Sequence, residues 1–294
     1  MERPNKVDDR ASLKTITSNS FITAKGLSSL SLKARKMLYI AISQCRKTDC
    51  QFYTFEISAV DFAKLMGITP QAVYQDAKVI ARELMKGTLE VVPRGKKEFR
   101  MYSLFSTCEY TKNGVILFKL NPDMTEFLLQ LKRDFSQPLL QDFLKMKSPY
   151  SMAVWHLMQR EMHSRKPGIT DTIEFDLMLD EMRTATGTEN KLLQIKGFKT
   201  RVLDQALEEI KNNCGVKITY ANIKKNRKVV GFHFKAIMAS IHVNEEDIPQ
   251  STKDRCELFA LKQKAKQTGL TILEQERYDM LDARINRLNI DLSF

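Results

Sequence analysis

The stretch 191–235 constrains the fold of this chain more than any other part of the sequence. It is typical of one long helix, 196–211, then two strands, 215–221 and 228–236, joined by a basic turn at 222–227. A helix followed by a hairpin with a charged tip is the second half of a winged helix. These 45 residues contain 11 Lys or Arg against 3 Asp or Glu. Because duplex DNA is a rod of phosphates, a helix beside a basic hairpin suits its major groove and backbone.

At about 100° per residue, the helix 196–211 has one apolar face. That face is formed by Phe198, Val202, Leu203, Ala206, Leu207 and Ile210. Arg201 lies nearly opposite and can reach outward, whereas Lys199 falls on the apolar arc and can leave it only by snorkelling. Taken alone, the helix also fits an amphipathic helix whose charged face is merely solvated.

An earlier stretch repeats the order helix, strand, short helix, long helix, hairpin. Ala63, Gly67 and Val73 have the spacing of a helix-turn-helix, and Thr69-Pro70 starts a helix that runs to about residue 86. Its polar face carries Gln71, Gln75, Lys78 and Arg82, whose amides and cations can bond base edges or phosphates. We expect the turn 93–97 to be a first wing, with Arg94, Lys96 and Lys97 on it. A solvated polar face is again the simpler alternative.

The charge is distributed unevenly over the 294 residues. The chain has a net charge of +12, of which +8 lies in residues 1–146, +4 in 147–246 and none in 247–294. A basic balance favours a nucleic-acid or anionic-membrane partner, but no run of about 18 apolar residues is present to span a bilayer. The N-terminus has no apolar signal core and the five cysteines have scattered spacings, so we expect a cytoplasmic protein with reduced thiols.

The motifs of several enzyme classes are missing from the sequence. None of His156, His163, His233 and His242 are two residues apart, as the metal-binding pair of a DNA-nicking initiator would be. There is no phosphate-binding loop of the G-x-x-x-x-G-K-[S/T] type and no C-x-x-C pair. The sequence therefore predicts no catalytic residues, no metal and no cofactor.

The second block resembles the iteron-binding plasmid replication initiators, a family with two winged helices. The stretch 198–203, Phe-Lys-Thr-Arg-Val-Leu, followed by Ala206 and Glu209-Ile210, is similar to the family's recognition helix. Ser148-Pro149-Tyr150 through Leu157 is similar to its second-domain opening helix, and 30–89 to its first winged helix. The resemblance covers about residues 15–245.

This resemblance implies binding to direct repeats at a plasmid origin, origin opening, and recruitment of the host initiator and the replicative helicase. It also implies a homodimer in equilibrium with monomer, autoregulation of the gene and a part in copy control. Two alternatives remain: a dimeric winged-helix transcriptional repressor using the same helices, and, less favoured, a DNA-nicking replication enzyme.

We therefore predict an α+β chain with two tandem winged helices and a helical C-terminal tail. The expected boundaries are a flexible N-terminus at 1–14, winged helices at 15–135 and 149–246, a linker at 136–148, and an extension at 247–294 with helices near 252–267 and 271–288. The expected partner is double-stranded DNA, and we expect no association with a membrane. The expected DNA contacts of the second domain are Lys196, Lys199, Thr200, Arg201, Lys224, Lys225, Arg227 and Lys228; those of the first domain are the seven side chains named above.

Overall fold

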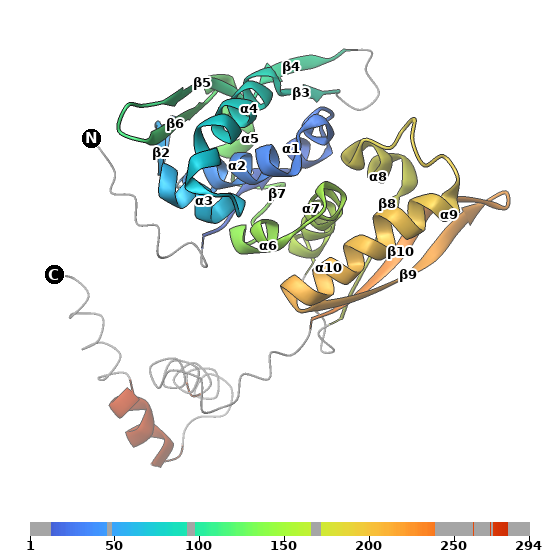
Figure 1. Ribbon diagram of the computed structural model, residues 1–294. Coiled ribbons are helices and arrows are strands. Elements are labelled where there is room, and N and C mark those ends of the chain that lie inside the picture. The colour runs from blue at the N-terminus through green and yellow to red at the C-terminus, as the bar shows by residue number, and fades with distance from the viewer. Residues whose placement is uncertain are drawn as a thin grey trace. The chain divides into compact units, whose positions relative to one another are not determined.

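The computed structural model describes residues 13–45, 49–92, 98–165, 172–238, 261, 271 and 273–281. The chain divides into a large unit, residues 1–239, and a tail unit, residues 240–294. Both predicted winged helices belong to the large unit, and Figure 1 shows their helices and strands in order.

The first winged helix begins with α2 (Leu32–Ser43), and Ser31 caps it by accepting a hydrogen bond from the Ala34 N–H. Strand β2 (Phe55–Ser58) leads into α3 (Ala59–Met66), which ends at Gly67 in the left-handed conformation with φ 64°. A 3₁₀ turn (Pro70–Ala72) then opens α4 (Val73–Lys86). The helix that Thr69-Pro70 was expected to start ends at Lys86 as predicted, but Thr69 makes no side-chain cap bond and the α-helical part begins only at Val73.

Two separate sheets follow α4. Strands β3 (Thr88–Val91) and β4 (Arg100–Ser103) form a two-stranded sheet, and Glu90 of β3 also bridges to Lys25. Strands β5 (Phe105–Tyr110) and β6 (Val115–Leu120) join β2 in the order β2-β6-β5. Residues 99–109, which taken alone suggest one strand, form the two strands β4 and β5. Leu104 is fully buried and its N–H donates to the Gly87 carbonyl, so the chain passes there from one sheet to the other.

The stretch that we expected to be a linker, 136–148, is folded. Strand β7 (Phe135–Ser136) pairs with β1 (Thr17–Ser18), and α6 (Leu140–Lys145) follows. Leu140, Phe143 and Met146 are completely buried, so this segment is part of the core and not an open tether. The large unit also contains short helical elements: α1 (Asn19–Thr23), a 3₁₀ turn (Leu27–Ser29), a 3₁₀ turn (Pro122–Met124) and α5 (Thr125–Leu128).

The second winged helix repeats the order of the first. It begins with α7 (Pro149–His163), β8 (Thr172–Met178) and α8 (Leu179–Thr186). One long helix follows, made of three contiguous segments: α9 (Ile195–Phe198), a π-helical segment (Lys199–Asp204) and α10 (Gln205–Cys214). The hairpin of β9 (Val216–Lys225) and β10 (Lys228–Met238) comes last. Its sheet order, β8-β10-β9, matches β2-β6-β5 of the first. The predicted structural repeat is therefore confirmed, with β3–β4 as an additional hairpin in the first copy.

One continuous hydrophobic core runs through both winged helices. At its centre His156 of α7 hydrogen-bonds the Tyr39 hydroxyl of α2 through Nδ1 and the Thr17 hydroxyl of β1 through Nε2, each at 2.9 Å. Burial lowers the pKa of His156 to about 3, so the ring is neutral near pH 7. Arg35 of α2 also donates to the Pro149 carbonyl at 2.9 Å. Polar bonds as well as apolar packing thus join α2 to α7.

Only part of the tail unit is described. Residues 273–281 are helical, and Leu281 is buried against Leu261 and Tyr278 within that unit. The rest of the two predicted tail helices, and residues 1–12 of the predicted flexible N-terminus, lie outside the described residues.

Candidate nucleic-acid interface

The helix Ile195–Cys214, which we call the recognition helix, is held to the second domain by its apolar face. Phe198, Val202, Leu203, Ala206 and Ile210 are completely buried, as the helical wheel predicted. The opposite side is exposed and carries Lys196, Thr200 and Arg201. The sequence did not predict the π-helical segment at Lys199–Asp204, which contains Thr200 and Arg201. Single π-helical turns inside α-helices are frequent at functional sites.

Lys199 lies apart from these exposed side chains. Its ammonium is 5.3 Å from the centre of the Tyr220 ring and 5.8 Å from that of Phe232. Both rings belong to the sheet behind the helix, so Lys199 makes cation–π contacts within the domain. This geometry favours packing within the domain over the DNA contact expected from the sequence, and nothing in the structure tests that contact directly.

The acidic residues of the recognition helix have partners within the domain. Asp204 accepts a hydrogen bond from the Tyr220 hydroxyl at 2.8 Å, and burial together with this bond raises the pKa of Tyr220 to about 12. Glu209 accepts from the backbone N–H groups of Lys147 and Ser148, and so holds the start of α7 against the helix. These carboxylates therefore have structural roles, although they lie on the same helix as Arg201.

The hairpin β9–β10, which we call the wing, extends beyond the end of α9 (Figure 1). Its loop is shorter than predicted: β9 runs to Lys225 and pairs with Lys228, which leaves only Asn226 and Arg227 between the strands. Both loop residues have positive φ, 50° and 64°, as a type I′ turn requires. Arg227 thus occupies a position at which glycine is favoured.

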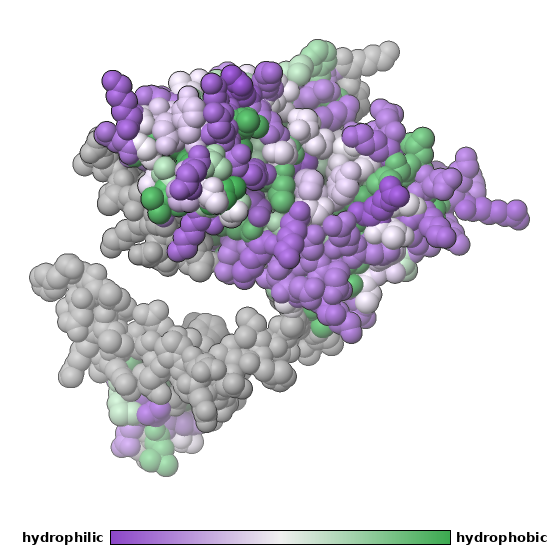
Figure 2. Space-filling model, in the orientation of Figure 1, coloured by the Kyte–Doolittle hydropathy of each residue, from purple (hydrophilic) through white to green (hydrophobic). Residues whose placement is uncertain are grey.

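The wing tip gathers four cations: Lys224, Lys225, Arg227 and Lys228 are all exposed. Lys225 is directly opposite Lys228, and like charges in that relation destabilise a strand pair. Figure 2 shows the outer end of the hairpin as hydrophilic. The charges of the tip repel one another and the turn suits glycine better than arginine, so neither feature stabilises the hairpin.

The predicted cluster on the first domain is also exposed. Gln71 lies on the 3₁₀ turn before α4, and Gln75, Lys78 and Arg82 lie on α4 itself. Tyr74 is half-exposed among them, and the Lys78 ammonium lies 5.9 Å from its ring centre. The fold therefore brings the four predicted side chains to one surface, with an aromatic ring that sequence reasoning did not single out.

The order of the strands assigns the wing of the first domain to a different hairpin from the one expected. Arg94, Lys96 and Lys97 lie outside the described residues, in the loop of the additional hairpin β3–β4. By sheet order, the hairpin equivalent to β9–β10 is β5–β6, whose turn spans residues 111–114 and exposes Lys112. A sequence signal for this wing existed in Lys-Asn-Gly at 112–114, a typical turn sequence, but its single positive charge made it less conspicuous.

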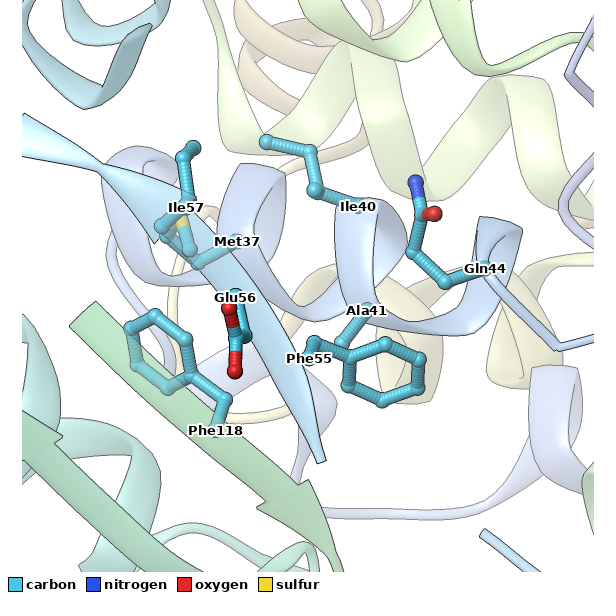
Figure 3. Close-up of a pocket in the computed structure, with 8 residues that line it drawn as sticks. All are labelled: Met37, Ile40, Ala41, Gln44, Phe55, Glu56, Ile57 and Phe118. Carbon is cyan, nitrogen blue, oxygen red and sulfur yellow. The ribbon is translucent and has the colours of Figure 1, made fainter. Parts of the chain in front are cut away.

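A small hollow lies between α2, β2 and β6 of the first domain. Figure 3 shows its lining, which is mostly apolar: Met37, Ile40, Ala41, Gln44, Phe55, Glu56, Ile57 and Phe118. Its volume of about 20 Å³ is enough for one or two water molecules and too small for a cofactor. This gap in core packing adds no chemistry to the exposed helices and wings.

The described part of the chain is thus a tandem winged-helix protein of the class that places helices and basic hairpins on double-stranded nucleic acid. A family model described as initiator replication protein, WH1, matches residues 14–159, and one described as initiator Rep protein, WH2, matches residues 178–236. The chain belongs to this initiator replication protein family. The first model includes most of α7, which our sequence-based division places in the second domain; the domain boundaries stay a prediction.

A solved structure has the same fold. The chain is similar to the crystal structure of Pi initiator protein in complex with iteron DNA, with a TM-score of 0.65 and 19% identity over 80% of this chain and all of that one. No helix in the described residues is both long enough and apolar enough to cross a membrane.

Proposed function

We propose that this chain is a plasmid replication initiator that binds repeated double-stranded DNA sites, iterons, at a replication origin. The observation that carries the proposal is that the second domain exposes two sets of cations: Arg201 on the recognition helix, and the four cations of the wing tip. Family membership supports the initiator role, and the DNA in the Pi initiator crystal supports the class of ligand.

In this proposal the two domains divide the binding surface. The recognition helix enters the major groove, where Arg201 bonds a base edge and Lys196 and Thr200 contact the backbone, while the wing neutralises phosphates. On the first domain, α4 supplies a second helix through Gln71, Gln75, Lys78 and Arg82. Because α6 and α7 join the domains through a shared core, both helices would act as parts of one binding body.

Footprinting on DNA that flanks the protein's own gene, at physiological salt, tests the proposal. We expect protection of several direct repeats at a fixed helical spacing. Protection of one inverted repeat over the promoter would favour a repressor instead. The proposal is refuted if no sequence is protected and all binding is equally sensitive to salt. The basic surface of the protein would then bind this DNA without recognising a sequence in it.

The further steps of initiation rest on the family resemblance alone. We propose that bound protein opens the origin and recruits the host initiator and replicative helicase, that it represses its own gene, and that it acts in the cytoplasm in a monomer–dimer equilibrium. Sedimentation of the free protein and of its iteron complex tests the last point. A dimer that dissociates on iteron DNA agrees with it, and a single species at all concentrations contradicts it.

We also propose that the chain acts by binding and not by catalysis, since the family is described by initiation and not by a chemical step. Incubation of supercoiled origin DNA with the protein and a divalent cation tests this. We expect the DNA to remain supercoiled, and conversion to the open-circle form would establish the nicking alternative.

A further inference from the structure

The loop between α8 and the recognition helix is organised around one buried side chain, Arg183. Its Nη1 donates to the carbonyls of Thr188 and Lys191 at 2.8 and 3.0 Å, and its Nη2 to those of Leu192 and Leu193 at 3.1 and 3.2 Å. A guanidinium that binds four backbone carbonyls of one short loop fixes the path of that loop, because each bond fails if its carbonyl turns away.

Two further contacts hold the same loop in place. The Arg183 guanidinium carbon lies 5.0 Å from the ring centre of Phe198, so the loop is also tied to the first turn of the recognition helix. Leu192 has φ 51°, a left-handed conformation that is rare for a bulky residue. Such a conformation persists only where surrounding contacts impose it, and it is a common feature of functional sites.

The consequence of this geometry is the position of Leu193. Its carbonyl points inward to Arg183, while its side chain is 71% exposed. Its apolar neighbours Leu192 and Ile195 pack against the core, whereas Leu193 and the following Gln194 are exposed. Figure 2 shows hydrophobic side chains among hydrophilic ones over the loop that joins α8 to α9. An exposed leucine held by a buried arginine is presented by the fold and does not result from a frayed end.

Leu193 comes directly before the N-terminal turn of the recognition helix. In helix-turn-helix proteins that end of the helix contacts base edges in the major groove. The groove offers hydrogen-bonding groups on every base pair, but its one apolar feature is the C5-methyl group of thymine.

We propose that Leu193 is a specificity-determining residue that packs against a thymine methyl group, and that Arg183 positions it. This inference deepens the proposed function and rests on it. It assigns to the loop a preference for thymine at one base pair of each repeat.

A methyl-deletion scan tests the contact. Each thymine of one repeat is replaced by deoxyuridine, which removes only the methyl group, and affinity is measured for the full-length protein. Burial of one methyl group corresponds to about a fourfold change in affinity, so we expect one thymine to show a loss of roughly that size. Leu193→Ala should weaken binding to the thymine site and abolish the discrimination there, whereas Leu193→Met should retain it.

Leu273, an exposed leucine of the tail unit, gives a matched control. Leu273→Ala should discriminate between thymine and deoxyuridine as the wild type does. The proposal is overturned if no thymine methyl matters to the wild type, or if Leu193→Ala keeps the same fourfold difference. Because wild-type binding to the unmodified repeat is measured in the same titration, a failure of the proposed function would be recognised separately, as absence of that binding.

Arg183→Lys tests the positioning role, since lysine keeps the charge but cannot bind four carbonyls in one plane. We expect loss of methyl discrimination with the salt dependence of binding unchanged. Unaltered discrimination would remove Arg183 from the argument. If the variant does not fold, as judged by circular dichroism, the surface substitutions at Leu193 still decide whether the methyl is read.

Discussion

Arg227 at the wing tip offers a substitution for which stability and DNA affinity should change in opposite directions. Its φ of 64° places an L-residue in the left-handed region, at a cost of roughly 1–2 kcal/mol. Arg227→Gly removes that cost, but glycine has more conformational freedom in the unfolded chain, which lowers the free energy of unfolding by about 0.5–1 kcal/mol. The net gain in the free energy of unfolding is about 0.5–1 kcal/mol, which corresponds to a rise in Tm of about 1–4 °C for a chain of this size.

The same change removes one cation from the proposed phosphate contacts. Each neutralised phosphate contributes about 0.9 to the slope of log K against log salt, so the slope should fall by about one unit. Arg227→Ala is the matched control: it loses the charge but keeps the left-handed L-residue, and should show the same slope without the gain in Tm. Thermal melting and titrations of repeat DNA between 50 and 200 mM salt measure both quantities.

Two outcomes would refute this reasoning. A lower Tm for Arg227→Gly would mean that the arginine side chain stabilises the hairpin by more than its backbone conformation costs. An unchanged salt slope for both variants would remove Arg227 from the DNA interface, and with it the explanation of why an arginine occupies the turn.

Three further substitutions separate base reading, domain packing and core electrostatics. Arg201→Ala should cost about 1–3 kcal/mol on the cognate site and relax base preference; equal weakening on all sequences in competition titrations would make it a phosphate contact. Lys199→Met should lower Tm through loss of about 1 kcal/mol of cation–π contact and leave the salt slope unchanged; a slope smaller by one unit would place Lys199 on the DNA. Burial lowers the pKa of His156 from 6.5 to about 3, so between these values the unfolded chain binds a proton that the folded chain does not. The free energy of unfolding should therefore reach its maximum above pH 6.5 and fall by about 1.4 kcal/mol per pH unit between 6.5 and about 3. Denaturant titrations of His156→Gln should show a free energy of unfolding that depends less on pH.

The elements that the sequence predicted best were those marked by local chemistry. Ser31 and Ser58 are of the residue type that favours helix starts, and each accepts a hydrogen bond from the first turn of its helix, while Gly67 ends α3 in the left-handed conformation that favours glycine. The apolar face of the recognition helix was also confirmed, because burial of every third or fourth residue follows from helical periodicity alone. In these cases the determining interaction lies within a few residues of the chain.

Features set by distant residues were not predictable in the same way. The π-helical segment at Lys199–Asp204 has no propensity signature, and the burial of α6 depends on α2 and α7, which come from either side of it. The Arg183 contacts are of this kind too. An arginine in the middle of a short amphipathic helix is expected to be solvated, and only the folded loop brings four carbonyls to it.

The two hairpins of the first domain show why charge alone could not identify the wing. The turn 93–97 contains three cations and the turn 111–114 only one, so a reading based on composition favours the first. Sheet order favours the second, since β5 and β6 join β2 as β9 and β10 join β8, and strand pairing over such distances is not encoded in either turn. The position of a wing relative to its helix follows from that pairing, because the shared sheet fixes where the hairpin projects. The sheet is therefore what the two winged helices have in common. The additional hairpin β3–β4 adds a second basic turn to the first domain and does not take the place of its wing.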